Sequence, residues 1–167
     1  MSKRGRQYIG ILAAVILYYI VHEGAHLLYA LFTGSFKGIV FMGLGVQIDI
    51  HSELLTDTQL GIFCLAGSVA TVVCAYIMVA FLGRICQAGS DLFKACAYYV
   101  TLALLLIDPV YLSLLCGFFG GGDMNGISLL IPELAARIVY GVLGIVNIIV
   151  ILKVVLPKYK KAFGKEL

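Results

Sequence analysis

The stretch YIGILAAVILYYIVHEGAHLLYALF, Tyr8–Phe32, decides the fold of this chain. A helix needs about 20 apolar residues to cross the hydrocarbon core of a bilayer, and this stretch is long enough. Apart from tyrosine hydroxyls, its ionisable side chains are His22, Glu23 and His26. Ionisable side chains inside a membrane are costly and usually serve a function. The stretch therefore predicts a membrane-spanning helix that carries a functional site.

Three further apolar runs follow, and the composition agrees with them. The runs are Gln59–Leu82, Ala95–Phe119 and Pro132–Leu156. Hydrophobic residues make up 62% of the 167 residues and charged residues 13%, whereas soluble domains carry about 25% charged residues. These figures exclude a soluble globular domain, a disordered chain and a disulfide-stapled module. We expect an all-α polytopic membrane protein with about four transmembrane helices, forming one domain over residues 1–167.

Two connecting segments have patterns of their own. After the first run, Ile39–Met42 is rich in β-forming residues, Gly43–Gly45 offers a turn and Val46–Ile50 alternates with period two. This pattern predicts a short β-hairpin at the membrane surface, with an irregular amphipathic loop as the alternative. Before the last run, Gly120–Gly122 precedes Asp123. Because glycine lets the backbone turn sharply, we expect a re-entrant segment there.

The basic residues gather near the chain ends. Lys3, Arg4 and Arg6 precede the first run, and lysines such as Lys158 and Lys165 follow the last one. Such clusters mark the cytoplasmic flanks of spanning helices and do not indicate nucleic-acid binding. We expect a multi-pass protein of the plasma membrane with both termini in the cytoplasm. The lipid bilayer is its surrounding partner, and the sequence is compatible with an oligomer.

His22-Glu23-Gly24-Ala25-His26 is an H-E-x-x-H motif. Residues four apart lie on one face of a helix, so both imidazoles can reach one zinc ion. The glutamate beside the first histidine is placed to take a proton from water at the metal. The motif predicts His22 and His26 as metal ligands, Glu23 as the catalytic base and one Zn²⁺ per chain.

A catalytic zinc site usually has a third protein ligand. Two carboxylates are candidates by depth in the membrane. Asp123 follows the glycines that would bring it to the metal, and it is the preferred ligand. Asp108 lies inside the third apolar run beside Pro109. It is the alternative ligand, a group that orients a histidine, or a carboxylate bonded to backbone groups that the proline frees.

The motif and layout resemble the site-2 protease family of zinc intramembrane metalloproteases. The β-forming segment Ile39–Ile50 and the small residues Ala66–Ala70 resemble features of that family. The family's N-x-x-P-x-x-x-L-D-G motif is absent, and Gly-Gly-Asp-Met-Asn-Gly stands in its place. The resemblance implies a minimal core of the family, with His22, His26 and an aspartate as ligands and Glu23 as the base.

These features predict a zinc-dependent intramembrane endopeptidase whose partner is a membrane-protein substrate. Asn125 is a candidate donor to the substrate, and the hairpin edge is a candidate strand on which the substrate pairs. Two alternatives remain open. One is a non-enzymatic metal- or proton-coupled transporter, since such proteins also use intramembrane His, Glu and Asp. The other is an intramembrane aspartyl protease that uses Asp108 and Asp123.

Overall fold

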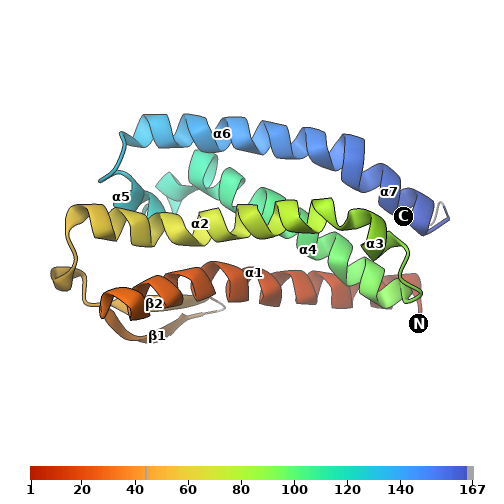
Figure 1. Cartoon of the computed structure of the whole chain (residues 1–167), viewed down its shortest axis with the longest axis horizontal. Helices are drawn as coiled ribbons and strands as arrows, with labels where there is room; N and C mark the ends of the chain where they lie inside the picture. Colours follow the sequence, from red (N-terminus) through yellow and green to blue (C-terminus); the bar gives the residue numbers. More distant parts are fainter. Residues whose placement is uncertain (44, 165–167) are drawn as a thin grey trace.

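The structure is a computed structural model that describes residues 1–43 and 45–164. Four helical segments are long and apolar enough to cross a membrane: Lys3–Thr33, Asp57–Ala80, Asp91–Phe118 and Glu133–Ala162. They run side by side, with both chain termini at one end of the bundle (Figure 1). The prediction of a multi-pass membrane protein with four spanning helices is confirmed. Leu44 of the predicted turn and Lys165 of the basic tail lie outside the described residues.

The spans are interrupted by tighter and wider helical turns. In chain order the elements are α1 (Lys3–Thr33), β1 (Phe36–Met42), β2 (Gly45–Ile50), η1 (Ser52–Leu54), α2 (Asp57–Ala80), α3 (Leu82–Cys86), α4 (Asp91–Val110), η2 (Tyr111–Leu115), η3 (Cys116–Phe118), α5 (Asp123–Ile127), α6 (Glu133–Val150), η4 (Ile151–Val155) and α7 (Leu156–Ala162). The third span is thus α4 with η2 and η3, and the fourth is α6 with η4 and α7. Within the described residues, η2 and η4 are π-helical turns.

The predicted hairpin between the first two spans is present. Strands β1 and β2 pair antiparallel, with Ile39 opposite Ile48. Helix α1 ends at Thr33 because Gly34 takes a left-handed conformation (φ 69°), which directs the chain out of the helix and into β1. The hairpin folds back along α1, away from the termini (Figure 1). Ile48 is buried at this contact.

A glycine-rich turn is present before the last span, at the position where the re-entrant segment was predicted. Gly120, Gly121 and Gly122 all have positive φ angles (78°, 87° and 51°), which glycine alone adopts at little cost. The chain then forms α5, which packs against α2 and buries Met124 and Ile127. This turn brings the start of α5 into the interior of the bundle.

Helix α4 is the most enclosed of the four spans and packs against α1, α2 and α6. Pro109 has no N–H, so the carbonyl of Leu105, four residues earlier, loses its helical partner. The side chain of Asn147 in α6 donates to this carbonyl at 2.6 Å. Tyr76 in α2 in turn donates its hydroxyl to Asn147 Oδ1 at 2.8 Å. Three helices are therefore joined at the proline by hydrogen bonds that satisfy a buried carbonyl.

We predict that Asn147→Leu lowers the free energy of unfolding by about 1–3 kcal/mol, because it leaves the buried Leu105 carbonyl without a donor. Pro109→Ala restores a backbone N–H that can reach the same carbonyl. In that background, Asn147→Leu should cost clearly less. Denaturant titration in detergent of wild type, both single variants and the double variant measures this coupling. Strictly additive losses would show that Asn147 does not serve the carbonyl that Pro109 frees.

Candidate metal centre

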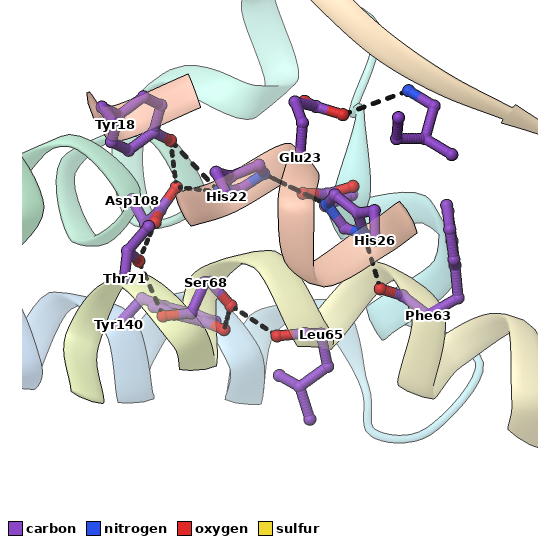
Figure 2. Close-up of polar contacts among 12 residues, drawn as sticks. Tyr18, His22, Glu23, His26, Phe63, Leu65, Ser68, Thr71, Asp108 and Tyr140 are labelled. Carbon is purple, nitrogen blue, oxygen red and sulfur yellow. Dashed lines mark hydrogen bonds and ion pairs between the residues drawn. The ribbon is translucent and has the colours of Figure 1, made fainter. Parts of the chain in front are cut away.

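The two histidines of the motif lie one turn apart on α1 and point the same way (Figure 2). Their Nε2 atoms are 3.2 Å apart, and both side chains are buried. The third donor comes from the start of α5. Asp123 Oδ2 lies 3.1 Å from His22 Nε2 and 3.4 Å from His26 Nε2. The structure thus brings together the three residues that the sequence analysis named as ligands.

The spacing of these three donor atoms suits one metal ion. Zinc bonds to nitrogen and carboxylate oxygen at about 2.0–2.2 Å in tetrahedral geometry, which places neighbouring ligand atoms about 3.3 Å apart. The observed separations of 3.1, 3.2 and 3.4 Å match that figure. Two imidazoles and one carboxylate are also a donor set that zinc accepts. His22, His26 and Asp123 could therefore hold a metal ion together.

The hydrogen bond on the far side of His26 fixes which ring nitrogen is free. His26 Nδ1 lies 2.8 Å from the carbonyl oxygen of Phe63 in α2. A carbonyl only accepts, so Nδ1 carries the proton and donates it. The lone pair is then on Nε2, which faces His22 and Asp123. Helix α2 thereby holds His26 in the tautomer that a metal ligand requires.

Gly67 of α2 lies directly against both imidazoles. A Cβ atom at this position would lie 2.5 Å from His26 Nε2 and 2.7 Å from His22 Nε2. This glycine was not among the site residues predicted from the sequence. The sequence feature that indicates this contact is the run of small residues in the second apolar stretch, which allows two helices to approach closely.

Glu23 lies beside the three-donor group without belonging to it. Its Oε2 accepts a hydrogen bond from the backbone N–H of Ile48 in β2 at 3.1 Å. Figure 2 shows the Glu23 side chain turned toward the strand and away from Phe63. The hairpin thus fixes the direction of this carboxylate. Glu23 is therefore not one of the three clustered donors.

A cavity of about 720 Å³ opens onto this cluster. Its walls are α1, the start of β2, the end of α4 with η2, and the glycine turn. Ionisable residues in the wall include His22, Glu23, Asp108 and Asp123, and most of the remaining wall is apolar. The side chains of Glu23, His22 and Asp123 therefore border the same cavity.

Asp108 does not join the donor group. It lies at the other nitrogen of His22, with Oδ1 3.3 Å from Nδ1. Asp108 and Asp123 therefore flank one imidazole ring, so they do not form the directly bonded carboxylate pair that shares a proton in aspartyl proteases. The Leu105 carbonyl freed by Pro109 is bonded to Asn147, so Asp108 does not fill that role.

Two residues that bond to Asp108 were not predicted from the sequence as part of the site. Tyr18 donates its hydroxyl to Asp108 Oδ1 at 2.5 Å, and Thr71 donates to Asp108 Oδ2 (Figure 2). Tyr18 lies four residues before His22, so helical spacing could have revealed it. For Thr71, the only indication in the sequence was its position among the small residues of the second apolar run.

Several other polar residues have partners outside the donor group. Glu133 pairs with Arg137, one turn further along α6, at 2.8 Å. His51 bonds Glu53 at 2.9 Å in the loop after β2. Asn125, the candidate donor to a substrate, instead donates its amide to the Gly120 carbonyl at 3.0 Å and braces the glycine turn.

Comparison with protein-family models, curated proteins and solved structures finds no match to this chain. The resemblance to site-2 proteases stays a prediction that rests on the motif and the layout.

We predict about one zinc ion per purified chain. His22→Ala, His26→Ala and Asp123→Ala should each remove most of it, because each takes away one of three ligands. Metal analysis of the detergent-purified protein after dialysis measures the content. His51→Ala is the matched control and should keep full content, since His51 lies in the loop. Full zinc content in a His22→Ala/His26→Ala double variant would rule out this centre.

We also predict that Gly67→Ala weakens zinc binding by roughly 10–100-fold, the range found for changes beside metal ligands. The added methyl group would displace both Nε2 atoms. Gly24→Ala, inside the motif, is the control because a Cβ there meets nothing within 4 Å. It should keep zinc affinity and raise helix stability by about 0.5–1 kcal/mol. Competition with a chromophoric chelator measures both affinities; equal values would contradict the close contact.

Proposed function

We propose that this chain is a zinc-dependent intramembrane endopeptidase that cleaves a membrane-spanning or membrane-adjacent segment of another protein. One observation carries the proposal. A carboxylate that can act as a base, Glu23, lines the same cavity as His22 and Asp123, two of the three side chains spaced to hold zinc. Ligands alone would suffice for metal binding, whereas peptide hydrolysis also needs a group that moves a proton.

Each residue then has a distinct task. His22, His26 and Asp123 hold the ion, which when bound supplies Lewis acidity that polarises a carbonyl group and makes water more acidic. The Glu23 carboxylate accepts a proton from the attacking water and returns it to the nitrogen of the departing amine. The hydrogen bond from the backbone N–H of Ile48 holds the Glu23 carboxylate in position at the cavity wall during both proton transfers.

The substrate segment must be extended before it can react, because a helix has its carbonyl groups hydrogen-bonded within itself. Strand β2 offers a place for such a segment. Its partner in the sheet, β1, covers one edge only, and residues Gly45–Gln47 line the cavity. A peptide added to the open edge of β2 would pass the Glu23 carboxylate. Main-chain pairing of this kind accepts many sequences, which suits an apolar substrate.

The proposal includes an orientation in the plasma membrane with both termini in the cytoplasm. Both chain ends lie at one end of the bundle (Figure 1). Basic residues gather at that end, among them Lys3, Arg6, Lys94 and Lys158. The positive-inside tendency assigns such an end to the cytoplasm. The hairpin and the start of α5 then lie toward the outer side.

The decisive variant is Glu23→Gln. We predict that it keeps zinc and the fold, because Glu23 is not a ligand, and that it lowers cleavage by roughly 10²–10⁴-fold, the usual contribution of a positioned general base. The assay is cleavage of a membrane-spanning reporter in detergent, with chelator and zinc add-back. Glu53→Gln, a similar change in the loop, should cleave as wild type does.

Cleavage at the wild-type rate by Glu23→Gln would refute the proposed mechanism even with zinc present. A non-enzymatic transporter gives a different pattern. It needs ligands and no base, so zinc flux into vesicles would persist in Glu23→Gln and no reporter would be cleaved by the wild type.

A further inference from the structure

Asp108 is the most deeply buried carboxylate among the described residues, with 1% of its surface exposed. It lies within the third span, where an unpaired charge would be costly. Three donors from two other helices surround it. Tyr18 of α1 donates to Oδ1 at 2.5 Å, Thr71 of α2 donates to Oδ2, and His22 Nδ1 of α1 lies 3.3 Å from Oδ1. A carboxylate buried in a membrane span usually has a function, because its burial is costly.

A purely structural role at the helix break does not account for this arrangement. The break at Pro109 frees the Leu105 carbonyl, and Asn147 already donates to it at 2.6 Å. A carboxylate could not serve a carbonyl in any case, because both are acceptors. The partners of Asp108 are instead the side chains of Tyr18, Thr71 and His22, and His22 is a candidate metal ligand.

We propose that Asp108 is a positioning residue that acts through His22. Its carboxylate accepts the Nδ1–H of the ring, which leaves the lone pair on Nε2, the atom that faces His26 and Asp123. The proposal rests on the metal centre described above. Ligating histidines commonly donate their second N–H to a carboxylate or carbonyl, which orients the ring and strengthens it as a ligand. Here His26 Nδ1 lies 2.8 Å from the Phe63 carbonyl oxygen, and His22 Nδ1 lies 3.3 Å from Asp108 Oδ1.

Tyr18 and Thr71 hold the carboxylate in place. Tyr18 lies one turn before His22 on α1, and its ring stacks on the imidazole with centroids 5.3 Å apart and planes 26° apart. Its hydroxyl therefore reaches Asp108 from the side on which His22 lies. Thr71 fixes the other oxygen from α2. With both oxygens bonded, the carboxylate cannot rotate away from His22 without losing a hydrogen bond.

The test is a double-mutant cycle on zinc affinity, measured by chelator competition in detergent. Asp108→Asn, which keeps the size of the side chain, should weaken zinc binding by roughly 10–100-fold. Tyr18→Phe and Thr71→Val should each weaken it less, since each removes one of the two hydroxyl donors. Tyr140→Phe is the control, because the Tyr140 hydroxyl bonds Ser68 and not Asp108; it should leave the affinity unchanged.

The cycle separates positioning from general support of the fold. In a His22→Ala background, Asp108→Asn should cause no further loss of the residual affinity, whereas in a His26→Ala background it should still cause one. A loss of equal size in both backgrounds would mean that Asp108 supports the bundle generally, and the proposal would fall.

A spectroscopic readout checks the same point without any substrate. The chain has three histidines, so ¹⁵N-histidine labelling gives a simple spectrum of the zinc-loaded protein. Asp108→Asn should shift the ring nitrogens of His22 and leave those of His26 and His51 in place. Unchanged His22 signals together with wild-type zinc affinity would overturn the proposal.

These outcomes are distinct from failure of the proposed function. If Glu23→Gln still cleaves, the mechanism of hydrolysis is wrong, but the zinc cycle still decides the role of Asp108. If the wild type holds no zinc at all, both the metal centre and the role of Asp108 are refuted.

Discussion

Ionisable side chains inside a bilayer must find their partners within the protein, and this constraint organises the centre of the molecule. Lipid tails cannot hydrogen-bond to such groups, so the two histidines and Asp108 take their partners from other elements of the bundle. Within the described residues, the cluster begins at Phe63 and runs through His26, Asp123 and His22 to Asp108. Five side chains and backbone groups from α1, α2, α4 and α5 are thereby held in one connected set. The packing of the helices and the geometry of the donors are two aspects of the same arrangement.

Close approach of the helices makes this set possible. Gly67 lets α2 touch the edges of both imidazoles, and Gly61 and Gly126 let α2 and α5 come together around Leu130 and Cys64. In a membrane, where lipid tails are as apolar as leucine, small residues provide the contact area that holds helices together. The same small residues therefore provide helix association and access of Asp123 to the histidines.

Much of the fold was predictable from the sequence because its signals are local. Apolar runs gave the spans, alternation gave the hairpin, and the spacing of His22 and His26 gave one face of α1. The features that could not be predicted depend on contacts between segments that are far apart in the sequence. Asp108 and Asp123 are both carboxylates at similar depth. Their depth alone does not determine which nitrogen of His22 each one contacts. The pairing of Asn147 with the carbonyl freed by Pro109 joins residues 42 apart, and no local pattern announces it.

The order in which the chain is made gives the buried cluster a further consequence. Tyr18 and His22 leave the ribosome long before their partners, since Asp108 follows Tyr18 by 90 residues and Asp123 follows His22 by 101. The first helix must therefore enter the bilayer with two imidazoles and a carboxylate unpartnered. Its stable residence there depends on segments still to be synthesised. A product that stops before the glycine turn lacks Asp123, the carboxylate that lies against both imidazoles of the first span.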